Sequence, residues 1–302
     1  MRIGIFGGAA NDGTLDAMIN EARRAEADGF ASFWVPQIFG HDALTALAVM
    51  GREVPRIELG TSVVPTYPRH PMMMAQQALT VNAATGGRLC LGIGLSHQVV
   101  VEGMWGMSFA KPVRHMREYL EVMMPLLEGR PVSHAGEEFR VNGAVAVPGG
   151  TRPNVVIAAL GEQMLKVTAR LADGTLTWCT GPQTLADHTI PTLRDAAEAA
   201  GRDATRVIAA LPVCVTEDRA AARERAAKVF VVYGQLPSYR AMLDKEGVGG
   251  PADIAIVGSR NEVIDRISAL AGIGVSDFAA VEFGGNPDEV AETRDAVKSL
   301  VN

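Results

Sequence analysis

The chain of 302 residues has few cysteines, few aromatic residues and no long apolar run. Its three cysteines, Cys90, Cys179 and Cys214, lie far apart, which excludes a disulfide framework and the ligand spacing of a zinc site. No run of 18 apolar residues is present, so the sequence predicts no membrane span. The opening segment RIGIF reads as a strand rather than a signal peptide, and we expect a cytoplasmic protein.

The chain also has fewer basic than acidic residues. The 28 Lys and Arg residues face 34 Asp and Glu residues, which leaves a formal net charge of −6. Such a chain has no general attraction to nucleic acid or to an anionic membrane, and we expect neither as a partner. Because 48% of the residues are hydrophobic and 21% are charged, the composition is that of an ordinary globular protein. We therefore expect a small-molecule substrate.

Short apolar segments alternate with helical patterns along most of the chain. Each segment is apolar enough to be covered on both faces, which is typical of the parallel strands of a (β/α)₈ TIM barrel. An open, doubly wound sheet is the alternative, but no GxGxxG follows the first strand. We predict one α/β domain over residues 1–302. The eight expected strands begin at Arg2, Ser32, Ile57, Arg88, Asn154, Thr175, Arg206 and Asp277.

Residues 95–150 are less regular and predict an insertion after the fourth strand. We expect a long loop from Leu95 to Ala110, a helix from Val113 to Leu127 and a small hairpin within residues 132–150. The loop carries an apolar set that suits either a lid over the site or core packing: Met104, Trp105, Met107 and Phe109. Further on, the sequence predicts a helix from about Leu185 to Ala200 and a long helix after Asp218.

The carboxyl ends of the strands are where a TIM barrel gathers its chemistry. After the third strand, Pro65 and Pro68 lack the amide hydrogen that would continue a sheet, and Pro71 suits the first turn of a helix. After the fourth strand, GIGLSHQ combines glycines that allow a flat ligand to approach with polar side chains; a tight turn is the alternative reading. After the fifth strand, AALGEQ opens onto free amides at a helix start, which suits an anion.

The segments RIELGTSVVPTYPRHP and AQQALTVNAATGGRLCLGIGLSH together resemble the luciferase-like monooxygenase superfamily. The resemblance is to its bacterial branch of coenzyme F420-dependent oxidoreductases, and it continues over residues 155–178 and 256–278. It implies a TIM barrel, a deazaflavin cofactor and a homodimer. It also implies a non-proline cis peptide bond between Ser62 and Val63, in a bulge that backs the tricyclic ring.

The resemblance carries cofactor-binding roles over to strand-end positions of this chain, with residues 159–161 expected to cradle the phosphate. The positions are Gln37, Ser62, Val63, Gly92, Ile93, Gly94, Ser96, His97, Gln98, Ala159, Leu160, Gly161, Trp178, Thr180 and Gly181. His97 is the candidate proton donor, although an isolated histidine is more often an ordinary hydrogen-bonding residue. Gln37-Ile38 and Leu95 depart from the pattern of the sugar-phosphate dehydrogenases, which argues against glucose 6-phosphate oxidation and leaves the proton donor unassigned.

The function that the resemblance implies is hydride transfer between C5 of coenzyme F420 and a small organic substrate. The alternatives are an FMN-dependent monooxygenase, which would need a flavin reductase as partner, and a non-catalytic flavin- or lipid-binding barrel. A basic set either forms a solvated helix face or attracts the acidic tail of coenzyme F420: Arg69, His70, Lys111, Arg114, His115 and Arg117.

Overall fold

The fold is a closed barrel of eight parallel strands, as predicted. The computed structural model describes residues 1–8 and 13–301. The strands are β1 (Arg2–Phe6), β2 (Ser32–Val35), β3 (Glu58–Thr61), β5 (Leu89–Gly94), β8 (Asn154–Ile157), β9 (Gly174–Trp178), β10 (Arg206–Val215) and β12 (Asp277–Glu282). They pair in this order around the barrel, and β12 pairs with β1 to close it. The short β4 (Val64–Pro65) continues β3 along β5.

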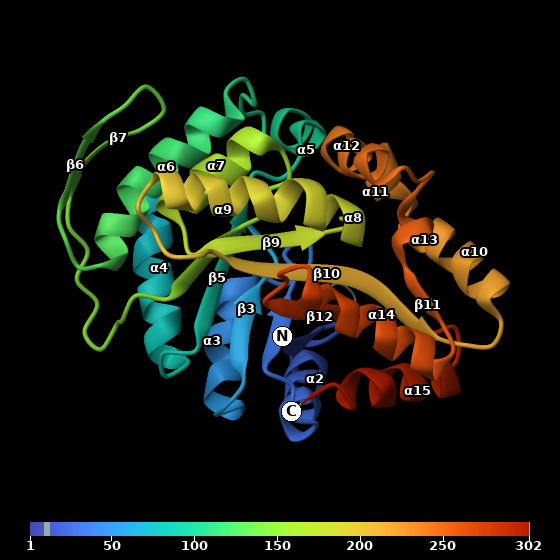
Figure 1. The fold of residues 1–302 in the computed structure, drawn as a ribbon. Helices are drawn as coiled ribbons and strands as arrows, with labels where there is room; N and C mark the ends of the chain where they lie inside the picture. Colours follow the sequence, from blue (N-terminus) through green and yellow to red (C-terminus); the bar gives the residue numbers. More distant parts are fainter. Residues whose placement is uncertain (9–12, 302) are drawn as a thin grey trace.

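Helices surround the strands on all sides (Figure 1). Those that follow the barrel strands are α2 (Leu15–Ala27), α3 (Ala43–Glu53), α4 (Pro71–Ala84), α6 (Pro112–Leu127), α7 (Glu162–Leu171), α9 (Ile190–Ala199), α14 (Arg260–Gly272) and α15 (Pro287–Lys298). Their starts follow local rules: Thr14 and Asp42 accept amide hydrogens from the first turns of α2 and α3, and Pro71 opens α4. These starts agree with the prediction.

The middle of the barrel is filled with side chains. A cluster of inward-facing residues closes it: Trp34, Cys90, Val156, Leu176, Ile208, Ala210 and Ala279. The Trp34 indole takes the space next to Gly60, where an added Cβ would lie 2.2 Å from the ring. All three cysteines are buried and free, as the sequence predicted. Because this apolar layer divides the lumen, the two ends of the barrel are separate places that cannot share a small ligand.

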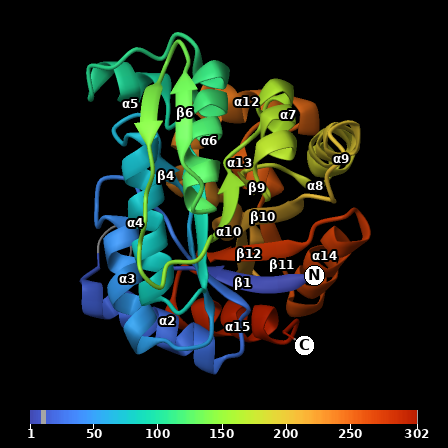
Figure 2. The same ribbon diagram turned by 90° about the vertical axis from the view of Figure 1, so that its left-hand side faces the viewer.

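The predicted insertion after the fourth barrel strand is present. Residues 98–103 form α5 (Gln98–Gly103), so the prediction of one long loop from Leu95 to Ala110 is wrong there. The predicted hairpin is confirmed as β6 (Val132–Ala135) paired antiparallel with β7 (Arg140–Gly143). It lies outside α6, at the edge of the molecule in Figure 1 and facing the viewer in Figure 2. The buried Glu118 of α6 accepts hydrogen bonds from three amides of the hairpin turn, at 2.8 to 3.2 Å.

A second excursion lies between β10 and β12, where the sequence predicted one long helix. That prediction is wrong, because the segment consists of α10 (Arg219–Val229), α11 (Val231–Gln235), α12 (Pro237–Glu246), α13 (Pro251–Ile254) and β11 (Ile256–Gly258). The expected helix over 185–200 is likewise α8 (Pro182–Thr184), a π-helical turn (Leu185–Thr189) and α9. Figure 1 shows α10 to α13 gathered near the carboxyl ends of β9 and β10. Within the described residues, no helix is long and apolar enough to cross a membrane.

Candidate cofactor and active site

The third barrel strand ends in a bulge at the carboxyl mouth of the barrel. Gly60 pairs with Cys90 and Val64 pairs with Ile93, so β3 and β4 use one more residue than β5 over the same span. The peptide bond between Ser62 and Val63 is cis, which confirms the expectation. The hydroxyl of Thr61 holds the bulge against β5: it donates to the Gly92 carbonyl at 2.7 Å and accepts from the Gly92 amide at 2.8 Å.

Gly92 and Gly94 make room for this bulge. A Cβ on Gly92 would lie 2.0 Å from the Thr61 carbonyl oxygen, and one on Gly94 would lie 2.6 Å from a methyl group of Val63. The Val63 side chain therefore stands where side chains of β5 would otherwise project into the lumen. From the sequence, we expected these glycines to allow the approach of a ligand. In the structure their immediate role is to let the third strand approach.

The carboxyl mouth of the barrel is partly exposed and apolar. Phe6, Ala158, Trp178 and Val281 each lie two residues beyond an inward-facing position of their strand, and Val63 joins them from the bulge. All five are partly exposed, whereas the layer below them is buried. An apolar floor with an open top fits the flat ring of a flavin or deazaflavin. We therefore regard this mouth as the candidate cofactor site.

Aromatic side chains of the second excursion cover one side of the mouth. The ring of Trp178 lies 5.6 Å from that of Phe230 and 5.5 Å from that of Tyr233. Tyr233 is 5.2 Å from Tyr239, and Tyr239 is 5.7 Å from His97. A continuous row of rings thus joins the sixth barrel strand to the loop after the fourth. Phe230, Tyr233 and Tyr239 had no signal in the sequence, because the row exists only once the excursion folds back over the barrel.

Burial sets the protonation of this row. It raises the pKa of both Tyr233 and Tyr239, so their hydroxyl groups stay protonated at neutral pH. The Trp178 indole opposes the rise at Tyr233, although the two groups do not reach hydrogen-bond geometry and the indole nitrogen has no acceptor within the described residues. Burial lowers the pKa of His97, so its imidazole is neutral at pH 7. Neutral donors and acceptors therefore line the site.

The other predicted residues of the GIGLSHQ segment take distinct places. Ser96 has a positive φ of 63°, an uncommon conformation for a residue with a side chain, and Cys179 at the end of β9 has a φ of 50°. Ile93 points outward into the main core, which removes its side chain from the lumen. Gln98 is exposed and donates to Glu102 at 2.9 Å. His97 is the member of this segment that joins the aromatic row.

The turn after the fifth barrel strand leaves helix amides free, as expected. Gly161 is the N-cap of α7 and has no side chain to bond the first-turn amides, and a Cβ there would meet only open space. The carbonyl of Leu160 lies 3.0 Å from the His188 ring nitrogen, while Ala159 is buried. Glu162 adds a carboxylate to the first turn, but its bond to Lys166 at 2.5 Å lowers its pKa and offsets its charge. The turn suits a phosphate group.

Three predicted positions already have partners of their own. The Gln37 side-chain carbonyl accepts the Ala43 amide at 3.1 Å, where it helps to cap α3. A Cβ on Gly181 would lie 2.2 Å from the carboxyl group of Glu246, which accepts the amides of residues 183 and 184. Thr180 is buried beside this turn. A carboxylate thus occupies the start of α8, and an acidic cofactor tail does not fit there.

The basic residues singled out in the sequence separate into different roles. Arg69 pairs with Asp42 at 2.7 Å, and Arg114 pairs with Glu137 and Glu138 of the hairpin turn. Lys111 and Arg117 are exposed, as a solvated face requires. His115 contradicts that reading, because it is buried, lies 3.0 Å from the Thr66 hydroxyl and stacks on Tyr67 at 4.0 Å. Burial lowers the pKa of His115 to about 4.

The apolar residues of the loop after the fourth barrel strand also differ from one another in their exposure. Met104 and Met107 are 61% and 41% exposed, so the alternative of core packing is wrong for them. Phe109 packs on Tyr67 at 5.5 Å, and Trp105 is half-buried. Across residues 1–8 and 13–301, no three His, Cys, Asp or Glu side chains gather in a way that could hold a metal ion.

A family model described as luciferase-like monooxygenase matches residues 1–293. The chain belongs to this family. The fold of the family agrees with the closed barrel, and the prediction of an oxidoreductase of the luciferase-like class is confirmed at the level of the family.

Two relatives with named activities are similar to most of this chain. A 5,10-methylenetetrahydromethanopterin reductase of Archaeoglobus fulgidus is 31% identical over 290 residues, covering 85% of this chain and 86% of that one. A protein of Mycobacterium tuberculosis, provisionally named a coenzyme F420-dependent oxidoreductase, is 30% identical and covers 89% and 80%. These luciferase-like relatives span nearly the whole chain.

Solved structures support the fold. The coenzyme F420-dependent tetrahydromethanopterin reductase of Methanopyrus kandleri superposes with a TM-score of 0.82 over 100% of this chain and 97% of that one, at 22% identity. An FMN-bound Baeyer–Villiger monooxygenase of Pseudomonas putida superposes with a TM-score of 0.78 over 100% and 97%, at 15% identity. Luciferase-like barrels with either cofactor thus share this architecture.

Proposed function

We propose that this protein is a coenzyme F420-dependent oxidoreductase that transfers a hydride to or from a small organic substrate. The observation that carries the proposal is the similarity over most of both chains to the mycobacterial relative named for coenzyme F420. The likeness to the solved coenzyme F420-dependent reductase of Methanopyrus kandleri is in keeping with it. Bound in the carboxyl mouth, the deazaflavin would supply C5 as the hydride donor or acceptor.

The residues of the mouth suit such a ring. The Val63 side chain and the Ser62–Val63 bond would back one face of the ring, and Trp178 would flank it. The amides at the start of α7, from Gly161 onward, would hold the phosphate, because they lack a side-chain cap and point out of a helix N-terminus. The pairing of Arg69 and Arg114 with carboxylates leaves them less suited to the acidic tail than the sequence suggested.

The aromatic row gives the chain a means to keep water from the reacting atoms. Tyr233 and Tyr239 would close the mouth on the side of Trp178, where low polarity strengthens the remaining polar contacts. His97 stands at the end of this row and would hold a proton on its ring as a neutral hydrogen-bond partner of the substrate. A homodimeric assembly stays a prediction from the resemblance, and a cytoplasmic location stays a prediction from the sequence.

An FMN-dependent monooxygenase is the second candidate. It is favoured by the description of the family and by the FMN-bound neighbour, and it would need a reductase that supplies reduced flavin. The mouth itself suits either ring, since its lining is apolar and the α7 turn would accept the phosphate of both. Cofactor choice therefore needs a direct measurement.

Fluorescence titration of the purified protein with coenzyme F420 and with FMN separates the two candidates. We expect submicromolar binding of F420 and binding of FMN that is weaker by about 100-fold or more, a difference of roughly 3 kcal/mol. Trp178→Leu should weaken binding of coenzyme F420, because it removes a ring that lines the mouth. Tighter binding of FMN would overturn the proposal.

Single-turnover oxidation of the reduced deazaflavin tests catalysis as distinct from binding. Enones, imines and carbonyl compounds form the substrate panel, and recovery of the absorbance of the oxidised deazaflavin is the readout. At least one class should react faster with the protein than without it. Tight binding with no turnover across the panel would favour a non-catalytic flavin-binding barrel.

A further inference from the structure

A cavity of about 280 Å³ lies at the amino-terminal end of the barrel, opposite the candidate cofactor site. Its lining includes residues at the starts of β1, β3, β5 and β8. Four arginines face it, Arg2, Arg56, Arg88 and Arg152, together with the single carboxylate of Glu58. The lining thus carries four guanidinium groups and one carboxylate in a chain whose net charge is −6. Three of these arginines also have a carboxylate from outside the lining within 3.4 Å, namely Asp277, Glu26 and Asp173.

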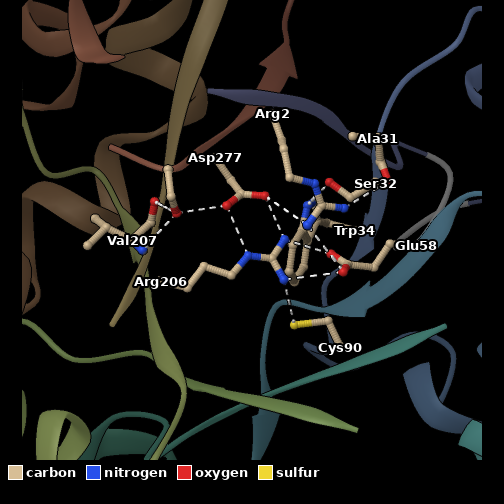
Figure 3. A network of polar contacts seen from close by, with 10 residues as sticks. Arg2, Ala31, Ser32, Trp34, Glu58, Cys90, Arg206, Val207 and Asp277 are labelled. Atoms are coloured by element: carbon tan, nitrogen blue, oxygen red, sulfur yellow. Dashed lines mark hydrogen bonds and ion pairs between the residues drawn. The ribbon is translucent and has the colours of Figure 1, made fainter. Parts of the chain in front are cut away.

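The two carboxylates beneath this cavity, Glu58 and Asp277, are hydrogen-bonded to Arg206 inside the barrel (Figure 3). Arg206 binds Asp277 through two bonds, of 2.9 and 2.6 Å, and Glu58 at 2.7 Å. Burial alone would lower the pKa of Arg206, but these two carboxylates outweigh it and raise the pKa. Arg2 reaches the same two carboxylates only at 3.4 Å. Arg206 therefore makes the shorter contacts to Glu58 and Asp277, and Arg2 balances the remaining negative charge from 3.4 Å.

Arg88 carries charge that no adjacent carboxylate balances by a hydrogen bond. It donates to the carbonyls of Ile57 at 2.7 Å and Gly51 at 2.9 Å, which occupy two of the five N–H groups of a guanidinium. Burial lowers its pKa, and Glu26 opposes this from a distance. An anion in the cavity would replace the water that this cation lost on folding.

Arg152 and Arg56 also have donors to spare. Arg152 makes one hydrogen bond within the described residues, from a terminal nitrogen to Asp173 at 2.8 Å, and its side chain is 30% exposed. Arg56 is 73% exposed and meets Glu26 at 3.3 Å. The four guanidinium groups come from separate segments of the chain, so they approach the cavity from different directions.

We propose that this cavity is a binding site for a phosphate dianion, either free inorganic phosphate or the phosphate group of a small monoester. Tetrahedral phosphate oxygens can accept hydrogen bonds from several directions, which matches guanidinium groups arranged around a cavity better than the planar oxygens of one carboxylate do. The apolar layer around Trp34 separates this site from the carboxyl mouth, so the ligand is distinct from any cofactor held there. The proposal does not rest on the proposed function.

Thermal unfolding in phosphate and in chloride at equal ionic strength tests the site. Phosphate should raise the melting temperature more than chloride does. The melting temperature is also measured in glycerol phosphate and in succinate. Glycerol phosphate tests whether a phosphate monoester binds as well as free phosphate, and succinate tests whether any dianion stabilises the protein equally. Equal stabilisation by succinate would overturn the assignment to phosphate.

Two variants test whether phosphate binds at this cavity. Arg56→Gln removes an exposed guanidinium from the cavity, and Arg52→Gln removes an exposed one from the last turn of α3, outside the lining. Phosphate affinity, measured by calorimetry, should fall roughly tenfold in R56Q, the loss of one charge-assisted contact, and stay unchanged in R52Q. Equal affinities in both variants, or no binding to the wild-type protein, would refute the site.

Discussion

The packing of the third barrel strand against the fourth makes a sharp prediction about two glycines. Gly92→Ala should destabilise the protein far more than Gly94→Ala, although both residues are buried glycines of β5 and lie two positions apart. Neither has a positive φ, so alanine is compatible with the backbone at both positions. The difference comes only from what the new methyl group would meet.

The magnitudes follow from those contacts. A methyl group in place of a hydrogen on Gly92 would lie 2.0 Å from the carbonyl oxygen of Thr61 and 3.1 Å from its carbonyl carbon. That backbone cannot move freely, because the Thr61 hydroxyl holds it to β5 through two hydrogen bonds. We expect a loss of more than about 3 kcal/mol, at the upper end of overpacking effects. At Gly94 the obstacle is a Val63 methyl group at 2.6 Å, which can turn away, and we expect a loss of about 1 kcal/mol.

Urea unfolding followed by circular dichroism measures both losses, and Val63→Ala completes a double-mutant cycle. In the V63A/G94A double variant the obstructing methyl group is gone and the Ala158 Cβ at 3.2 Å is the close neighbour that remains, so most of the cost of G94A should disappear, with a coupling of about 1 kcal/mol or less. V63A should not rescue G92A, whose obstacle is main chain. Equal stabilities of G92A and G94A, or rescue of G92A by V63A, would refute this account of the bulge.

Three further predictions concern buried charge and titration. Glu118→Gln should cost about 2 kcal/mol in denaturant unfolding, because the carboxylate accepts hydrogen bonds from three hairpin amides. Burial would raise the pKa of Glu118, but these amides outweigh it and lower the pKa. The stabilisation is therefore present above the unfolded-state pKa and is lost as the pH falls through the folded-state pKa. His115 has a pKa of about 4 in the folded protein, below the value of 6.5 in the unfolded chain. Stability should therefore fall as the pH drops from 6.5 to 4, by up to about 1.4 kcal/mol per pH unit, and His115→Gln should remove that slope. An NMR titration of His115 with a midpoint above pH 6 would contradict this prediction. Arg206→Met leaves Glu58 and Asp277 without their main cation and should cost about 3 to 5 kcal/mol in calorimetric unfolding, whereas a loss below 1 would show that Arg2 alone suffices.

The barrel could be predicted from the sequence because its signals are local. Strand and helix periods, the N-caps at Thr14 and Asp42 and the proline that opens α4 each depend on a few neighbouring residues. The Ser62–Val63 cis bond was reached by resemblance and the free amides of the α7 turn from the local sequence pattern, and the structure bears both out. Whether those residues bind the cofactor stays a prediction.

The sequence did not predict contacts that join distant segments. The aromatic row needs Tyr233 and Tyr239 to fold back over Trp178, and the start of α8 receives Glu246 from 62 to 63 residues further along the chain. His115 read as part of a charged helix face, yet the side of α6 that it occupies is the one that packs against Thr66 and Tyr67. No periodicity within a single element encodes these pairings.

The sequence by itself thus determined the order of the eight barrel strands and the closed parallel barrel, because strand and helix periods are short-range patterns repeated along the chain. The family followed from the resemblance of particular segments. Only the tertiary structure decided what lies at the two ends of that barrel. Closing it brings Arg206 to Glu58 across 148 positions of sequence and gathers four arginines from separate segments around one cavity, and such contacts depend on barrel geometry rather than on neighbouring residues.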